Sequence, residues 1–333
     1  MGNLNRRHFV SGLAFTATAG ILLNELSGCG ENKSRPKSSG KPLSLQAPWV
    51  NDAEFIGYFV AIANGYYSAN ALDFRYQAGG PDKIAGEILG AGGCDIALTN
   101  IDGTAEAITR QGAKFKIIGA QYQKSPLGIV TLDNSGIRTP GDLTGRRIAV
   151  PAANRATLET FLKLNGVNPE KVRLLPYQYD PTILVDGHVD ATVDFVTNVP
   201  YTIRLRGKKP FSFLFYDYGF RQFMDTVVVH EDTIKLKRKE LIGFLRASRR
   251  GWDENFKDVN KYPETLKSMM SDQTGRTVDS EKYFNTEQQP LISSAHGVFA
   301  LTEEAIEDNI RSLRAVGLHA TRSMFVPDLL SEV

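Results

Sequence analysis

Cysteine is scarce in this sequence of 333 residues, and so are the motifs of catalysis. Only Cys29 and Cys94 are present, so the chain has no closely spaced cysteine pair for metal or redox chemistry. Its five histidines are scattered, and no H-E-x-x-H, G-x-S-x-G or G-x-x-x-x-G-K motif occurs. We therefore expect a protein that is not an enzyme and that carries neither a metal nor a cofactor.

An excess of charge of one sign is also missing. The chain has 39 basic and 37 acidic residues, a net charge of +2, which gives no electrostatic reason to expect nucleic acid as a partner. With 42% hydrophobic residues, the composition is that of an ordinary globular protein. Single cores stop growing at roughly 250–300 residues, so the length predicts two lobes.

The N-terminus has the features of an export signal. Arg6 and Arg7 precede a mostly apolar run from Phe9 to Leu23, which is shorter than the roughly 20 residues needed to span a bilayer. The arginine pair followed by Phe9 resembles a twin-arginine signal. Residues 1–28 are therefore predicted to be a signal peptide, and the mature protein to be exported to the periplasm or the cell surface.

The stretch "LSGC", which ends at Cys29, resembles the bacterial lipobox, in which the cysteine is acylated. The resemblance implies that Cys29 anchors the protein to a membrane by a lipid. Residues 29–42 then form the lipidated cysteine and a polar, flexible tether. A stray cysteine after a cleaved signal is the alternative.

From residue 43 the chain alternates short β-rich runs with helical patterns, which predicts an α/β fold with parallel or mixed sheets. Segments 88–100 and 183–198 echo each other: both place Ile-Leu before a glycine turn, an Asp and an apolar strand that leads to Thr-Asn. The alternation of β-rich and helical segments restarts after residue 134, so 134–138 is a candidate crossover between the lobes. We assign 43–133 and 227–333 to one lobe and 134–226 to the other.

Candidate ligand-binding residues are those at predicted strand exits, because ligands of open α/β sheets bind outside the carboxyl ends of the strands. In the first lobe they are Trp49, Asn51, Glu54, Tyr58, Gly79, Gly80, Pro81, Asn100, Asp102, Gln121 and Tyr122. In the second lobe they are Asn154, Tyr177, Asp194, Asn198 and Tyr216. Aromatics, amides and carboxylates dominate while basic residues are scarce, which favours a flat, neutral or weakly basic heterocycle over a sulfonate or nitrate anion.

The stretch "NDAEFIGYFVAIANGYY" at 51–67 combines both roles, packing and binding. Asn51 is expected to cap a helix, with Glu54 completing a capping box. Gly57 leaves one side of the helix thin enough for close packing. Glu54 and Tyr58, near the start of the helix, are predicted to face the ligand together with Trp49, and the rest of the helix to hold the lobe together.

Several stretches resemble the superfamily of solute-binding proteins for thiamine-pyrimidine precursors, riboflavin, sulfonates, taurine and nitrate. They are "GYFVA", "NGYYSANALDF", "GGPDKI", "QYQKSPLGIVTL", "GDLTGRRIAV" and "FVTNVP". The resemblance covers nearly all of 43–235. It implies a two-lobed type II periplasmic-binding-protein fold, in which crossover strands join two α/β lobes and a ligand cleft lies between them.

The resemblance also implies a monomer that delivers a small-molecule ligand to the permease and ATPase subunits of an ABC importer. "AEFIGYFVA" and "GGPD" look most like the thiamine-pyrimidine and riboflavin binders, with Trp49 as a stacking surface and Asn198 as a polar contact. The sequence departs from the usual "GLDV" with "ALDF" at 71–74. We therefore expect a lipid-anchored binder of a small heteroaromatic nutrient.

Three alternatives remain at this point. The first is a sulfonate, taurine or nitrate binder of an ABC importer, and the second is a sensory lipoprotein that does not deliver solute. The third is a pyrimidine synthase of the same superfamily. The export signal and the lack of a cysteine-rich iron-binding motif make the synthase the least favoured.

Overall fold

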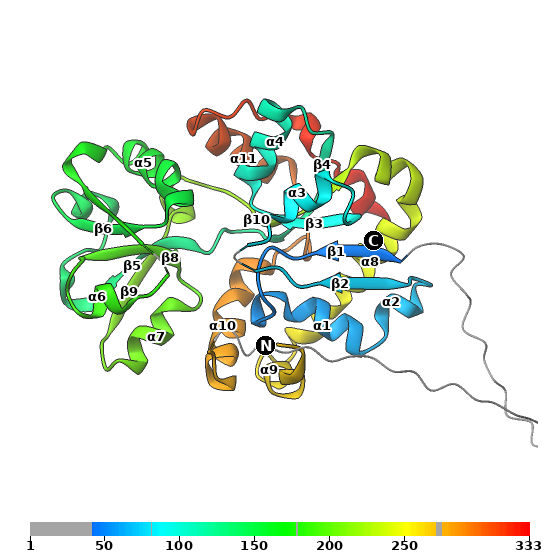
Figure 1. Ribbon diagram of the computed structural model, residues 1–333, viewed down its shortest axis with the longest axis horizontal. Helices are drawn as coiled ribbons and strands as arrows, with labels where there is room; N and C mark the ends of the chain where they lie inside the picture. Colours follow the sequence, from blue (N-terminus) through cyan, green and yellow to red (C-terminus); the bar gives the residue numbers. More distant parts are fainter. Residues whose placement is uncertain (1–41, 81, 178, 271–274) are drawn as a thin grey trace, which may run out of the picture. The chain divides into compact units, whose positions relative to one another are not determined.

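The computed structural model describes residues 42–80, 82–177, 179–270 and 275–333. The predicted signal peptide, the predicted lipidation site Cys29 and the predicted ligand residue Pro81 lie outside the described residues. Within the described ranges, no helix is both long and apolar enough to cross a membrane. The strands form two separate five-stranded sheets, each with helices on its faces (Figure 1).

The first sheet has the strand order β2-β1-β3-β10-β4. Its strands are β1 (Leu43–Gln46), β2 (Phe74–Gln77), β3 (Ile96–Thr99), β4 (Phe115–Tyr122) and β10 (Met224–His230). β1 pairs in parallel with β2 and β3, whereas β10 runs antiparallel to β3 and β4. The first residues of β10 therefore lie beside the last residues of its neighbours, as in the pair Met224 and Tyr122.

The second sheet has the strand order β7-β6-β8-β5-β9. Its strands are β5 (Leu127–Leu132), β6 (Arg147–Val150), β7 (Arg173–Pro176), β8 (Ala191–Phe195) and β9 (Pro210–Leu214). β6 pairs in parallel with β7 and β8, and β5 runs antiparallel to β8 and β9. β3 and β8, the strands of the two echoed segments, therefore hold the same place: each lies between a parallel and an antiparallel neighbour.

The strand pairing places the first boundary between the lobes earlier in the chain than predicted. The prediction placed residues up to 133 in the first lobe and a crossover at 134–138, but β5 pairs with β8 and β9 of the second sheet. The chain therefore changes sheets at 123–126, directly after β4. Local sequence could not reveal this, because the sheet to which a strand belongs is decided by partners about 60–85 residues away. On the return path, β10 begins at Met224, close to the predicted boundary.

Helices cover both faces of the first sheet (Figure 1). α1 (Ile56–Ala63), α2 (Tyr66–Ala69) and α8 (Glu231–Asn255) share one buried cluster with Leu45, Leu98 and Val227 of the strands. α3 (Ala85–Gly90), α4 (Ile101–Gln111) and α11 (Glu303–Ala315) share another with Ala97 and Val228. Neighbouring strand residues thus point to opposite faces, as the two-residue strand period requires.

The second sheet is covered in the same way. α5 (Arg155–Leu164) packs on one face, and α6 (Thr182–Val185) and α7 (Val199–Leu205) contribute to a separate buried cluster with Val130 and Ala149. The remaining α-helices are α9 (Lys261–Thr265) and α10 (Val278–Ile292), which follow α8 in the chain.

Two glycines allow α1 and α8 to cross closely. A Cβ atom at Gly57 would lie 2.2 Å from the Trp252 ring, and one at Gly251 would lie 2.1 Å from the Gly57 carbonyl oxygen. Such distances are far below van der Waals contact, so both positions exclude any larger residue. The prediction that Gly57 serves close packing is confirmed.

The entry into α1 differs from the prediction by one residue. A short 3-10 helix, η1 (Ala53–Phe55), precedes α1, and its cap is Asp52, whose Oδ1 accepts a hydrogen bond from the Glu54 amide at 2.9 Å. The predicted cap by Asn51 is wrong, because the Asn51 side chain donates to the Met269 carbonyl oxygen at 2.9 Å instead. The shift matters because it turns a second carboxylate, Asp52, toward the interior.

Candidate functional site

Three segments of the first lobe meet where β1 and β4 end and β10 begins. Gln121, near the end of β4, donates from its Nε2 to the backbone oxygen of Glu54 at 2.8 Å and to Oδ2 of Asp225 at 3.2 Å. All three residues are buried. This is the edge of an α/β sheet at which ligands bind in related architectures.

Glu54 and Asp225 form a pair of buried carboxyl groups that influence each other and can share a hydrogen bond when one of them is protonated. A hydrogen bond between two carboxyl oxygens requires a proton on one of them. Burial first, and then the charges of Asp225 and Asp52, raise the pKa of Glu54 well above its usual value. Burial raises the pKa of Asp225 to about 7. The pair therefore holds a proton near neutral pH, so it offers a ligand one hydrogen-bond donor and one carboxylate acceptor.

Arg276 supplies the positive charge beside this pair. Its Nη1 lies 2.5 Å from Oδ2 of Asp52 and 4.0 Å from Oε1 of Glu281. Burial raises the pKa of Asp52, and the Arg276 charge opposes that shift. Burial and the Asp52 charge raise the pKa of Glu281 to about 7. The cluster thus holds four carboxyl groups, those of Asp52, Glu54, Asp225 and Glu281, and Arg276 forms ion pairs with Asp52 and Glu281, so acidic groups outnumber the basic residue named here.

α10 fixes the loop that carries Glu54. Oε2 of Glu281 accepts from the Ala53 amide at 2.8 Å, and Nε2 of Gln288 donates to the Ala53 carbonyl oxygen at 2.6 Å. The Tyr122 hydroxyl in turn donates to Oε1 of Gln288 at 2.6 Å. Both backbone groups of Ala53 are therefore held by side chains of α10, which restricts the position of Glu54 next to it.

The second lobe contributes Asp194 and Tyr177 at the matching edge of its sheet. The Tyr177 hydroxyl donates to Oδ2 of Asp194 at 2.6 Å. Burial raises the pKa of Asp194 to about 6, and the charge of Arg276 lowers it. Arg276 thus acts electrostatically on carboxylates of both lobes. Tyr179 packs against Tyr177 at a ring-centroid distance of 5.8 Å and is 56% exposed.

Several residues predicted to bind the ligand take part in this arrangement. Glu54 and Gln121 lie in the first-lobe cluster, and Tyr177 and Asp194 are joined in the second. Trp49 remains 36% exposed on the loop that leads to Asp52. Its backbone oxygen accepts from the Gly79 amide at 2.8 Å.

Three predicted aromatic site residues are placed elsewhere. Tyr58 is fully buried, with its ring among Tyr76, Phe244, Trp252 and Phe299, so it belongs to the aromatic core and not to a ligand platform. The close crossing of α1 and α8 turns its ring inward. Tyr122 is likewise buried against α10. Tyr216 lies on the second crossover, where its ring centroid is 5.4 Å from Nζ of Lys124 and 5.8 Å from the guanidinium carbon of Arg221.

The other predicted positions have local roles or stand apart. A Cβ atom at Gly79 would lie 2.4 Å from the Ala47 carbonyl oxygen, and Gly80 has a φ of 155°, so backbone geometry requires both glycines. Asn100, Asn154 and Asn198 each precede a helix without a capping bond from the side chain. Asp102 accepts from the Gly103 amide.

Sequence reasoning missed Asp52, Asp225, Arg276 and Glu281. A signal existed for Asp225, a lone acidic residue at the start of an apolar β run, and the structure gives it a φ of 49°. A left-handed conformation outside glycine is uncommon and concentrates at functional sites. No comparable signal marks Arg276 or Glu281, because tertiary structure alone brings the start of α10 to this edge.

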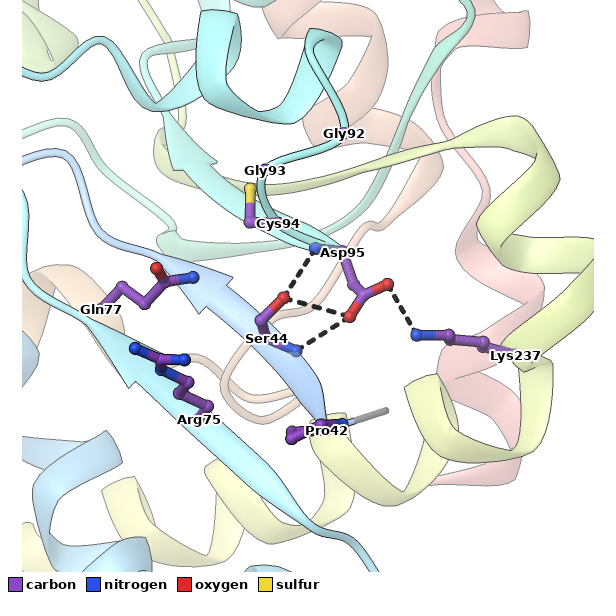
Figure 2. A pocket seen from close by; sticks show the side chains of 9 residues that line it. All are labelled: Pro42, Ser44, Arg75, Gln77, Gly92, Gly93, Cys94, Asp95 and Lys237. Carbon is purple, nitrogen blue, oxygen red and sulfur yellow. Dashed lines mark hydrogen bonds and ion pairs between the residues drawn. The ribbon is translucent and has the colours of Figure 1, made fainter. Parts of the chain in front are cut away.

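A separate pocket of about 260 Å³ lies at the start of β3 (Figure 2). Figure 2 shows Asp95 between Ser44 and Lys237, with the Lys237 Nζ 2.7 Å from Oδ1 of Asp95. The Ser44 amide and hydroxyl both donate to Oδ2 of the same carboxylate. These polar groups satisfy one another, so the pocket is a weaker candidate site. Across the described ranges, no group of three or more His, Cys, Asp or Glu side chains is arranged to hold a metal ion.

Comparison with known proteins identifies the family. Residues 52–261 match the family described as NMT1/THI5 like, which is more than half of the chain. The chain belongs to the NMT1/THI5-like family. It is 23% identical over 237 residues to a formylaminopyrimidine-binding protein of Halalkalibacterium halodurans, covering 68% of this chain and 70% of that one. It is also 23% identical to the riboflavin-binding protein RibY of Chloroflexus aurantiacus over 214 residues, covering 63% and 61% of the two chains.

Solved structures of the same fold include the periplasmic aliphatic sulphonate binding protein SsuA of Escherichia coli. The TM-score is 0.65 at 14% sequence identity, covering 83% of this chain and 91% of SsuA. The prediction of a two-lobed periplasmic-binding-protein fold of the α/β class is confirmed. At this level of identity the likeness concerns the fold and leaves the ligand to the chemistry of the site.

Proposed function

We propose that this NMT1/THI5-like protein is the solute-binding component of an ABC importer and captures a small heteroaromatic nutrient with N–H donors. A thiamine-pyrimidine precursor or a related vitamin such as riboflavin fits this class. The observation that carries the proposal is the buried carboxyl pair Glu54 and Asp225, held by Gln121 at the ligand-binding edge of the first sheet.

The chemistry of the pair suits an aminopyrimidine. An exocyclic amine and a ring nitrogen present a donor and an acceptor side by side, and a carboxyl pair that holds one proton offers the complementary acceptor and donor. Gln121 adds its Oε1, which is buried and forms no hydrogen bond within the described residues. The exposed rings of Trp49 and Tyr179 would provide stacking surfaces.

The charge balance argues against the sulfonate, taurine or nitrate alternative. An anion needs unpaired cations or helix N-termini, whereas Arg276 already has ion pairs with Asp52 and Glu281. Asp194 and the Glu54–Asp225 pair would also repel an anion, because a nearby charge of the same sign destabilises a buried ion. The names of the two relatives, a formylaminopyrimidine-binding and a riboflavin-binding protein, support the same choice.

The remaining parts of the proposal follow from the N-terminus and the family. The protein would be non-enzymatic, exported, and anchored to a membrane through lipidated Cys29, as a monomer whose partners are the permease and ATPase subunits of the importer. Lobe 1 would comprise 43–122 and 224–333, and lobe 2 would comprise 127–214, joined by the two crossovers. A sensory lipoprotein is the alternative that lacks these subunits, and copurification with a permease distinguishes the two.

The direct test is calorimetric titration of the mature protein. The ligands are 4-amino-5-hydroxymethyl-2-methylpyrimidine, riboflavin, taurine and nitrate. We expect saturable binding of one of the two heterocycles and none of the anions. Binding of an anion with no response to either heterocycle would overturn the assignment.

A further inference from the structure

α7 and α10 belong to different lobes and meet through an aromatic contact. The ring centroids of Tyr201 on α7 and Tyr283 on α10 lie 5.2 Å apart at an interplanar angle of 34°. The guanidinium carbon of Arg204, one turn further along α7, lies 5.0 Å from the Tyr283 centroid. Such aromatic and cation–π contacts are attractive beyond the area they bury.

α7 is fixed to the second lobe and α10 to the first. Val199 and Ile203 of α7 are buried in a cluster with strands of the second sheet. Leu291 and Ile292 of α10 are buried with the core of the first sheet. The contact between Tyr201 and Tyr283 therefore depends on how the two lobes are turned toward each other.

The contact also lies away from the crossovers about which the lobes would turn. The Leu291 carbonyl oxygen accepts from the amides of Gln123 and Lys124, in the first crossover, at 2.9 and 3.1 Å. Tyr283 is eight residues earlier on the same helix, which at 1.5 Å per residue is about 12 Å along its axis. Rotation about the crossovers must separate Tyr283 from α7 while the Leu291 contacts persist.

α10 links this contact to the candidate ligand site. Glu281 and Gln288, on either side of Tyr283, hold both backbone groups of Ala53, next to Glu54. We propose that Tyr201, Arg204 and Tyr283 form a latch that holds the two lobes closed over the ligand without touching it. These three residues affect the affinity for the ligand by holding the lobes in position, without contact with the ligand. The inference rests on the proposed function insofar as the latch serves ligand retention.

The expected effect is a faster loss of ligand. Removing the Tyr283 ring deletes both contacts, which should raise Kd roughly 5- to 50-fold, and removing Arg204 alone should raise it roughly 2- to 5-fold. Because a latch acts after the ligand has entered, koff should rise while kon stays within about twofold.

The variants are Tyr283→Ala and Arg204→Ala, with Arg206→Ala as the matched control. Arg206 is an exposed arginine at the end of α7, and it takes no part in the aromatic and cation–π contacts with α10 given above. Titration with 4-amino-5-hydroxymethyl-2-methylpyrimidine and riboflavin, followed by stopped-flow dissociation of the one that binds, gives Kd and koff. The graded order Tyr283→Ala, Arg204→Ala, Arg206→Ala supports the latch, and equal constants for all three variants overturn it.

A second measurement tests the latch even if neither heterocycle is the ligand. Small-angle X-ray scattering of wild type and Tyr283→Ala reports the radius of gyration with and without each heterocycle. If the wild type binds neither heterocycle, the proposed function fails, and the ligand-free comparison decides the latch. A larger radius for Tyr283→Ala supports it, and an equal radius in every condition overturns it. Thermal melts show whether each variant is folded, since Tyr283 is only half-buried.

Discussion

Replacement of Asp225 by Asn should weaken ligand binding and yet stabilise the protein at neutral pH. Burial raises the pKa of this carboxyl from an ordinary value of 3.8 to about 7, a difference of about three pKa units, each worth 1.36 kcal/mol. Ionised Asp225 therefore costs the folded state up to about 4 kcal/mol. Asn at this position still buries a polar group and loses the contact with Glu54, so we expect a gain of only about 1–2 kcal/mol in the free energy of unfolding.

The sign of the pH dependence follows from linkage. Because the folded state holds the proton more tightly than the unfolded state, stability is complete below about pH 4 and is lost as the pH rises through about 7. Asn cannot ionise, so Asp225→Asn should differ least from the wild type below about pH 4 and should exceed it increasingly as the pH rises to 8. Asn also tolerates the φ of 49° at this position, so the backbone is not a confounding factor.

The assay combines urea unfolding at about pH 4 and at pH 8 with calorimetric titration of the heterocycle that binds. Loss of a charge-assisted hydrogen bond should weaken binding roughly 10- to 100-fold at pH 8. Asp217→Asn, at an exposed carboxylate of the second crossover, is the control and should change neither quantity. A loss of stability at pH 8, or unchanged affinity, would refute the assignment of Asp225 to the ligand site.

Three further predictions concern the first lobe. Gly57→Ala should cost about 1–3 kcal/mol of stability, because its new methyl would overlap the Trp252 ring, and chemical denaturation measures this loss. Tyr58→Ala should lower stability by about 3–5 kcal/mol through the cavity left in the aromatic core, and a melting temperature equal to that of the wild type would contradict the core placement. Ala71, with a φ of 57°, replaces the glycine usual at this turn, so Ala71→Gly should raise the free energy of unfolding by about 0.5–1 kcal/mol, as measured in urea.

Much of the fold could be predicted from the sequence because it depends on local periodicity. The alternation of helical and β-rich segments predicts two α/β lobes. The echo between 88–100 and 183–198 corresponds to equivalent strands, β3 and β8. The glycine at 57 was predictable for the same reason, since a helix face without side chains permits close packing. Each of these inferences uses residues that are neighbours in the chain.

The sequence also named one carboxylate and one amide of the first-lobe cluster, Glu54 and Gln121, because each lies near a predicted strand end. It could not name their partners. Asp225 lies 104 residues from Gln121, and only the antiparallel placement of β10 beside β4 brings the two together. The same holds for β5, whose sheet is decided by distant partners.

The sequence by itself thus determined the class of fold and the polar, acidic character of the strand exits, which are properties of composition and spacing. Tertiary structure decided which acidic groups meet, because burial and mutual repulsion, and with them the raised pKa values of Glu54 and Asp225, arise only when the chain is folded. It also decided that Tyr58 packs in the core and that the Tyr216 ring lies near Lys124 and Arg221. Which face of a helix becomes buried depends on the element packed against it.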